Sequence, residues 1–149
     1  MRAVVQRVHQ ASVSVEGRVI GEIGTGLLVY LGVQKDDTER DVDYIADKVR
    51  HLRIFPDDKG LMNRDVADAE GGVLVISAFT TTADARRGRR PSFENAAAPE
   101  IAEPVYERFC RALLDHGLDL TRGRFGAVMQ VRSNNDGPIC ILLDSGRTF

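Results

Sequence analysis

Two largely apolar runs constrain the fold of this chain more than any other feature. The first covers residues 27–33, from Leu27 to Val33, and the second is Val73-Leu74-Val75-Ile76. Side chains of a strand point alternately to its two faces, so an unbroken apolar run is typical of a strand buried on both. A chain of 149 residues with 43% hydrophobic residues has the length and composition for one such core. We therefore expect a single domain over residues 1–149.

Alternating patterns predict further strands. Ala11, Val13 and Val15 alternate with polar residues, the period of a half-buried strand. A turn at residues 16–18 would return the chain through residues 19–23. We interpret Gly21, Gly24 and Gly26 as turn glycines. Their spacing does not match a dinucleotide-binding fingerprint, and a strand follows them where that motif has a helix. Residues 125–131 alternate as another strand, and the last predicted strand covers residues 139–144.

Two segments show helical periodicity. Thr38 is a candidate N-cap for a helix whose apolar stripe is Val42, Ile45, Ala46, Val49 and Leu52. A second helix is predicted over residues 99–116 and closed by Gly117. Its apolar stripe steps by four through Ile101, Val105, Phe109 and Leu113, with Tyr106, Cys110 and Leu114 beside them. Pro104 would either lie in its first turn or kink it. Strands outnumber helices, so the predicted class is mixed α+β.

The composition excludes several classes of function. No apolar run approaches the roughly 18 residues that cross a membrane, and the first residues become polar too early for a signal-peptide core, so we expect a cytoplasmic protein. A net charge of −2 argues against indiscriminate nucleic-acid binding. Cys110 and Cys140 both lie in apolar contexts, which favours buried free thiols. Three His and two Cys, all widely spaced, predict no metal site.

Two polar segments adjoin apolar runs and form a candidate site. Ser77-Ala78-Phe79-Thr80 leaves the strand at residues 73–76, and Asn134-Asn135-Asp136-Gly137-Pro138 precedes the last strand. A serine nucleophile needs a base within hydrogen-bond reach, but the three histidines lie in no recognisable triad context and the chain has no Gly-x-Ser-x-Gly elbow. A standard serine hydrolase is therefore not predicted. The residues alone leave the Gly137-Pro138 bond open between trans and cis.

Arg86-Arg87-Gly88-Arg89-Arg90 places four guanidinium groups within five residues, shortly after the hydroxyl-bearing segment. Such a run is a solvated loop or a phosphate contact, and basic patches by themselves are weak signals. Both readings stay open.

Several separated motifs resemble the D-aminoacyl-tRNA deacylases, a proofreading family. The central signature covers residues 72–80, followed by Ala83-Asp84 and Gly88-Arg89-Arg90-Pro91-Ser92-Phe93. The similarity spans nearly the whole chain. The other matching segments are Val4-Val5-Gln6-Arg7-Val8, Leu52-Arg53-Ile54-Phe55, Gly60-Leu61-Met62-Asn63, Phe125-Gly126-Ala127 and Asn135-Asp136-Gly137-Pro138.

The resemblance implies the deacylase fold, a β-rich barrel-like sheet with two main helices, and a homodimer with its active sites at the subunit interface. Ser77, Ala78, Phe79 and Thr80 would be the catalytic segment and would hold the 3′-terminal adenosine and its ester. Gly137 and Pro138 would form a cis gate that rejects L-aminoacyl groups in the partner's site, with Arg7 holding the motif and Met129 and Cys140 binding substrate.

The same resemblance implies catalysis assisted by the ribose 2′-hydroxyl of the tRNA, without a cofactor. Glycyl esters, including glycyl-tRNA(Ala), would also pass the gate. The chain departs from the family pattern at Ala78, Val128 and Cys140, where the family has Gln, usually Asp, and Thr. Two alternatives to a D-specific deacylase therefore remain: an editor of the same fold with relaxed chirality or altered substrate, and a catalytically weakened protein that binds tRNA ends.

Overall fold

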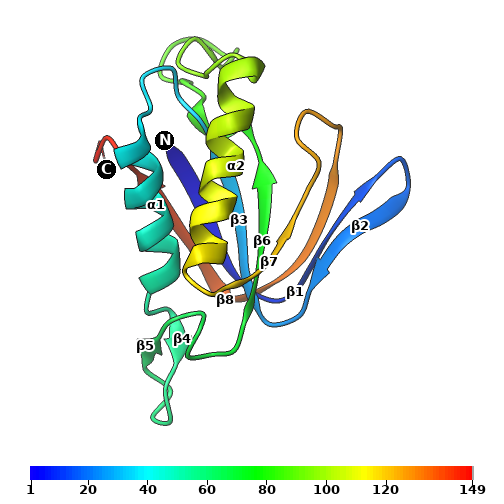
Figure 1. The fold of residues 1–149 in the computed structure, drawn as a ribbon, viewed down its shortest axis with the longest axis vertical. Coiled ribbons are helices and arrows are strands. Elements are labelled where there is room, and N and C mark those ends of the chain that lie inside the picture. The colour runs from blue at the N-terminus through cyan, green and yellow to red at the C-terminus, as the bar shows by residue number, and fades with distance from the viewer. Residues whose placement is uncertain (149) are drawn as a thin grey trace.

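The computed structural model describes residues 1–148, which form a six-stranded sheet, a two-stranded hairpin and two helices (Figure 1). This arrangement agrees with the predicted mixed α+β class. A 3-10 turn, η1 (Phe79–Thr82), follows one of the central strands. The helices are α1 (Glu39–His51) and α2 (Pro99–Asp115), and the strands are β1 (Arg2–Val15), β2 (Arg18–Ile23), β3 (Gly26–Gly32), β4 (Phe55–Pro56), β5 (Met62–Arg64), β6 (Gly72–Ser77), β7 (Asp119–Arg122) and β8 (Gln130–Asp144).

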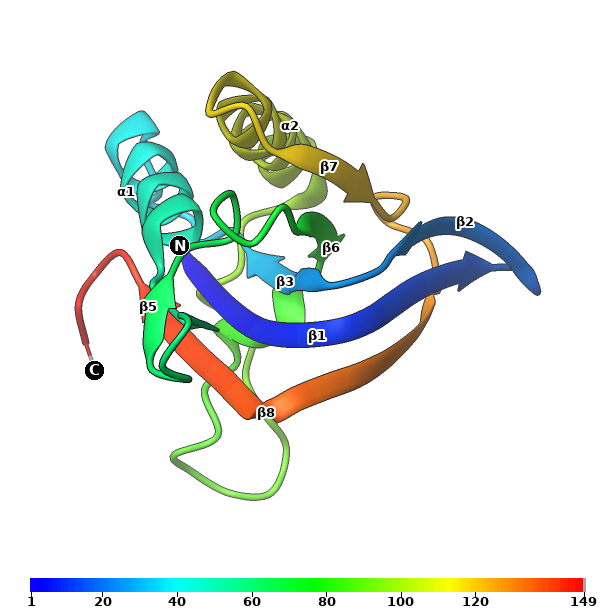
Figure 2. The ribbon, with the colours of Figure 1, turned by 90° about the horizontal axis from the view of Figure 1, so that it is seen from below.

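Strand β1 organises the sheet, because it pairs antiparallel with three strands. Its first half pairs with β3 and its second half with β2 along one edge, while β8 pairs along the other edge. From β3 the sheet continues through parallel pairs to β6 and β7. Figure 2 shows β1 and β8 curving together around the body of the protein.

The curled sheet brings β2 towards β7, which gives the barrel-like shape that we expected. Gly21 lies inside β2, so its prediction as a turn glycine was wrong. A Cβ at Gly21 would lie 2.6 Å from Cγ2 of Thr121 and 3.4 Å from the carbonyl oxygen of Arg122, both on β7. A glycine at this position therefore allows the two strands to approach closely.

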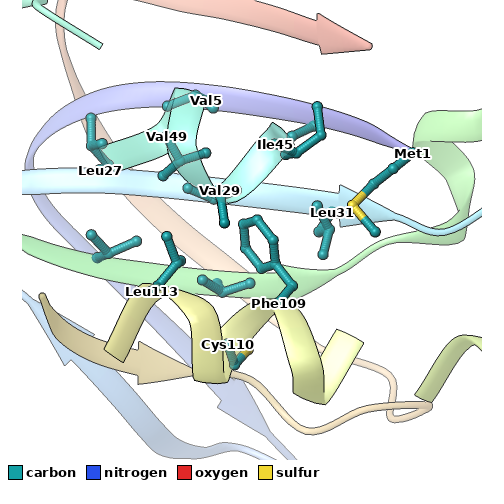
Figure 3. Close-up of a cluster of buried hydrophobic side chains, with 14 of the residues drawn as sticks. Met1, Val5, Leu27, Val29, Leu31, Ile45, Val49, Phe109, Cys110 and Leu113 are labelled. Atoms are coloured by element: carbon teal, nitrogen blue, oxygen red, sulfur yellow. The ribbon is translucent and has the colours of Figure 1, made fainter. Parts of the chain in front are cut away.

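The two apolar runs are buried on both faces, as predicted. Leu27, Leu28 and Val29 are each 0% exposed. Alternate residues of β3 and β6 belong to two core clusters, one against the helices and one inside the curl of the sheet. Figure 3 shows the first cluster, in which Leu27, Val29 and Leu31 lie between α1 and α2.

Helix α1 begins where the sequence predicted. The Oδ2 atom of Asp41 accepts hydrogen bonds from the backbone N–H of Thr38 (2.8 Å) and from its hydroxyl (2.7 Å), and this closes the first turn. The buried side of the helix is the predicted stripe of Val42, Ile45, Ala46 and Val49.

Helix α2 begins at Pro99 and runs on through Pro104, so Pro104 does not mark its first turn. Its buried stripe was predicted only in part. Phe109 and Leu113 are buried together with Ala102, Tyr106 and Cys110, whereas Ile101 is 55% exposed. The predicted face is therefore confirmed at Tyr106, Phe109, Cys110 and Leu113. It was wrong at Ile101 and at Leu114, which is 44% exposed, because the helix packs through Tyr106 and Phe109 and this turns both residues towards solvent. Neither helix has both the length and the apolar composition needed to cross a bilayer, within the described residues.

Three further predictions were wrong. Residues 125–129 are a turn, and the strand begins at Gln130. Asn134 to Pro138 lie inside β8, where the pairing with β1 shifts register, and do not form a corner before a strand. Cys110 is buried, and this raises the pKa of its thiol to about 11, but Cys140 is exposed because it lies on the outer face of β8.

The core assignment predicts a difference between two residues of the same helix. Phe109→Ala should lower the free energy of unfolding by about 3–5 kcal/mol, because it opens a cavity between α2 and the sheet. Ile101→Ala should change it by no more than about 0.5 kcal/mol, as is usual at exposed positions. Urea unfolding followed by circular dichroism measures both values, and equal losses would contradict the assigned stripe.

Candidate active site

A cavity of about 730 Å³ opens at the carboxyl ends of the parallel strands β3 and β6. The segment Ser77 to Thr80, predicted as catalytic, forms one wall, and Met129 lies on another. Apolar and aromatic side chains supply most of the remaining surface. The lining residues are Tyr30, Leu31, Val33, Ile76, Ser77, Ala78, Phe79, Thr80, Ala96, Ala97, Pro99, Ala102, Tyr106, Phe125, Gly126, Ala127, Met129 and Val131.

Local hydrogen bonds hold the segment Ser77 to Thr80 in place at the end of β6. The backbone N–H of Ala78 donates to the carbonyl of Leu31 (2.8 Å), which continues the pairing of β6 with β3. The hydroxyls of Thr81 and Thr82 donate to the carbonyls of Ala78 (3.0 Å) and Phe79 (2.7 Å). Such local bonds are typical where a strand ends in a turn. The N–H of Ala78 is therefore committed to the sheet.

The turn also packs tightly on β3. A Cβ at Gly32 would lie 2.1 Å from Oγ1 of Thr81 and 2.9 Å from the carbonyl oxygen of Ala78. Only a glycine leaves room for the turn at this distance. The N–H groups of Phe79 and Thr80 open η1, and the first N–H groups of a helical turn have no acceptor within the turn. Neither N–H group has a backbone acceptor within residues 1–148.

The cavity lining contains two tyrosines but no Asp, Glu, His, Lys, Arg or Cys. The hydroxyl of Tyr106 donates to the carbonyl of Val75 (3.1 Å). Burial raises the pKa of Tyr106 and of Tyr30 above the ordinary value for a phenol. Both phenols therefore stay protonated near neutral pH, and the lining offers no group that would act there as a general base.

Another part of the cavity wall belongs to the turn between β7 and β8. Phe125 packs on Tyr106 with ring centroids 5.7 Å apart. Met129 packs with the second core cluster, and its Sδ would lie 2.6 Å from a Cβ at Gly123. Val128, one of the departures from the family pattern, is 92% exposed and does not line the cavity.

The second predicted group of residues lies on β1 and β8. The Gly137-Pro138 peptide bond is cis, and Gly137 has a φ of +124°. Nε of Arg7 is 2.8 Å from Oδ2 of Asp136, and Nη1 of Arg7 donates to the carbonyl of Ile54 (2.5 Å). The buried Arg7 side chain therefore links Asp136, the residue before the Gly-Pro pair, to Ile54, which follows α1.

Asn135 holds the same motif from inside β8. Its Nδ2 donates to the carbonyls of Arg7 and Ile139, each at 2.9 Å. These bonds span the register shift, where β8 departs from regular pairing with β1. Gly137 and Pro138 are exposed as a result, and they project from the sheet on a well-supported base.

Within one chain, the two groups do not meet. Gly137, Pro138, Arg7 and Cys140 are all missing from the cavity lining. Cys140 faces outward beside Gln6, whose Nε2 is 3.9 Å from Sγ. In residues 1–148, no three side chains of His, Cys, Asp or Glu gather closely enough to hold a metal ion.

Sequence reasoning missed part of the cavity. Tyr30, Tyr106 and Phe125 line it, but their apolar neighbours made them indistinguishable from ordinary core residues. Ala96 and Ala97 line it only because the chain returns to Val33 there, where the N–H of Ala97 donates to the carbonyl of Val33 (3.0 Å). A long-range contact of this kind has no local sequence signal.

Known proteins resemble this chain over its whole length. It is 52% identical over 149 residues to the D-aminoacyl-tRNA deacylase of Symbiobacterium thermophilum, covering 100% of this chain and 99% of that protein. It is 57% identical over 145 residues to the D-aminoacyl-tRNA deacylase of Roseiflexus castenholzii, covering 97% and 92%.

Solved structures agree on the fold. A structure described as the c-Myc DNA Unwinding Element Binding Protein superposes with a TM-score of 0.92 at 38% identity, covering 97% of this chain and 98% of that one. A probable eukaryotic D-amino acid tRNA deacylase superposes with a TM-score of 0.81 at 17% identity, covering 95% and 97%, which shows the fold alone. The family model described as D-Tyr-tRNA(Tyr) deacylase matches residues 4–144. The chain therefore belongs to the D-Tyr-tRNA(Tyr) deacylase family, whose members are hydrolases.

Proposed function

We propose that this protein hydrolyses the ester of D-aminoacyl-tRNA, releasing the amino acid and free tRNA, and that it spares L-aminoacyl esters. The observation that carries the proposal is the cavity at Ser77 to Thr80, which has room for an aminoacyl ester but is lined by no acid, base or thiol. An enzyme built in this way positions its substrate and depends on a reactive group that the substrate brings. The membership of the family, which covers residues 4–144, supports the same substrate.

The ribose 2′-hydroxyl of the terminal adenosine is the reactive group that we propose. It would orient the attacking water, which adds to the ester carbonyl carbon. The bond between that carbon and the ribose 3′-oxygen then breaks, and the oxygen takes up a proton. The N–H groups of Phe79 and Thr80 would donate to the oxyanion, a contribution that is among the largest in acyl transfer. The rest of the rate acceleration would come from the rigid turn, which positions the ester.

Chiral selection would come from the Gly137-Pro138 pair of a second copy. The pair is exposed and supported by Arg7 and Asn135, but it lies outside the cavity of its own chain. A homodimer that inserts the pair into the partner's cavity would place rigid backbone against the α-carbon of the amino acid. An L side chain would collide with that backbone, whereas a D side chain or a glycyl group would not. A tRNA substrate would place this activity in the cytoplasm.

The first prediction concerns matched esters of one tRNA. Purified protein should hydrolyse D-aminoacyl-tRNA and glycyl-tRNA(Ala) and leave the corresponding L ester intact, because only the L side chain meets the gate. Release of labelled amino acid over time measures all three rates. Equal cleavage of D and L esters would show an editor with relaxed chirality, a reading that the exposed thiol of Cys140 beside the gate favours. Cleavage of none would leave only a tRNA-end-binding protein.

The second prediction separates substrate-assisted chemistry from a protein nucleophile. Ser77→Ala should retain the rate within about tenfold, because no base in the cavity activates its hydroxyl. A substrate whose terminal adenosine lacks the 2′-hydroxyl should lose about 10²-fold or more, the usual contribution of a group that handles protons in the reaction. Single-turnover rates on both substrates test this. Loss of activity in Ser77→Ala with the 2′-deoxy substrate still cleaved would reverse the assignment.

The third prediction concerns the support of the gate. Arg7→Met keeps the apolar stem but removes the contacts with Asp136 and Ile54. The preference for D over L esters should fall about tenfold or more, because hydrogen bonds to charged groups contribute about 1.5–3 kcal/mol. The ratio of kcat/KM for the two esters is the measurement.

Arg53→Met is the matched control. Arg53 also donates to a backbone carbonyl, that of Asn63 (2.9 Å), but it is exposed and, within residues 1–148, forms no ion pair with Asp136. Its substitution should leave the D to L ratio unchanged. A ratio that drops equally in both variants, or in neither, would count against Arg7 as the support of the gate.

A further inference from the structure

The basic run at residues 86–90 forms a closed loop beside the cavity. The backbones of Asp84 and Ser92 exchange two hydrogen bonds of 2.8 Å, which close the loop at its base. The loop leaves η1 through Ala83 and returns at Phe93. Figure 2 shows this light-green loop projecting past β8, away from the rest of the protein.

One of the four arginines has a structural role. Arg86 donates to Asp84 through Nε (2.9 Å), Nη2 (2.6 Å) and its backbone N–H (3.0 Å). These bonds hold the pKa of Asp84 well below its ordinary range, so the carboxylate stays charged and the pair stays formed. A bidentate pair of this kind sets the direction in which the loop leaves its base.

The other three arginines have no such partner. Arg87, Arg89 and Arg90 are exposed and make no hydrogen bond or ion pair within residues 1–148. The carboxylate of Asp84 at the loop base is already bound by Arg86. Three guanidinium groups therefore point a concentrated positive charge at solvent on a protein whose net charge is −2. Concentrated cationic groups of this kind attract phosphates.

The loop is fixed relative to the cavity at both ends. Phe93, which follows the loop, packs edge to face on Phe79 of the cavity wall with ring centroids 5.1 Å apart. Ala96 and Ala97 then continue into the cavity lining. The basic loop is therefore held beside the part of the cavity wall that Phe79 forms, and we call this position the rim.

We propose that Arg87, Arg89 and Arg90 bind the backbone phosphates of the single-stranded 3′ end of tRNA, with the Arg86–Asp84 pair acting as the strut that aims them. The inference rests on the proposed function, because it takes the terminal adenosine to lie in the cavity. The loop would contribute to affinity and not to the chemical step, since no guanidinium lines the cavity. Phosphate contacts position a nucleic acid without reading its sequence.

The test is the triple variant R87Q/R89Q/R90Q, assayed in two ways. Binding of an acceptor-stem minihelix with a single-stranded 3′ end, followed by fluorescence anisotropy, should weaken about tenfold or more. The slope of log Kd against log salt should become shallower by roughly 2, since each contact to a single strand contributes roughly 0.7. Hydrolysis of a D-aminoacyl adenosine ester without phosphates should proceed at the wild-type rate.

A charge-matched variant, in which the exposed residues Arg18, Lys59 and Arg111 are each changed to Gln, controls for net charge. Arg18 begins β2, Lys59 lies between β4 and β5, and Arg111 lies on α2, so none of the three belongs to the basic loop. Weaker minihelix binding in the loop variant alone, with the small ester still cleaved, supports the proposal. Equal binding by the two variants overturns it, as does loss of cleavage of the small ester, which would give the loop a structural role. If the wild-type protein cleaves neither D-aminoacyl-tRNA nor the small adenosine ester, the proposed deacylase function is wrong. The ratio of the minihelix affinities of the two variants still decides whether the loop binds phosphates.

Discussion

The structure depends on the pairing of β1 with three other strands. One edge of β1 binds β3, which pairs in parallel with β6 and so leads to the segment Ser77 to Thr80. The other edge binds β8, which carries Gly137 and Pro138. Backbone hydrogen bonds of a sheet allow little relative movement between strands, so the cavity and the Gly-Pro pair are held in one rigid frame although they do not meet within a chain. This rigidity is what a steric gate requires.

The chemistry of the cavity follows from what its walls lack. A hydroxyl at Ser77 is inert without a base, and the tyrosines that share the cavity remain protonated because they are buried. What the walls do offer is shape, together with the backbone donors of η1. Such a site accelerates a reaction by orienting a substrate that carries its own reactive group. In our proposal, the three arginines of the rim would add electrostatic attraction at a distance from the reacting atoms, so affinity and chemistry would be carried by different parts of the chain.

Local sequence patterns correctly predicted the strands that are buried on both faces and the helix that has one apolar face. The runs at residues 27–33 and 73–76 had to be strands covered on both sides, and the cap at Thr38 with its stripe had to begin an amphipathic helix. The same reasoning failed where packing geometry decides. Ile101 is apolar and correctly spaced but exposed, because Tyr106 and Phe109 set the rotation of α2. The alternation at residues 125–129 has the period of a strand, yet those residues turn to close the cavity.

The sequence by itself determined both helices, the two buried strands at residues 27–33 and 73–76, and the family, because these depend on residue types and on spacings along the chain. Only the tertiary structure decided which polar groups have a hydrogen-bond or ion-pair partner within the chain and which do not. The N–H of Ala78 is bound by Leu31, Arg7 by Asp136 and Ile54, and Arg86 by Asp84. The availability of a donor or a charge depends on partners brought together by folding, and contacts between distant segments leave no periodic signal in the sequence.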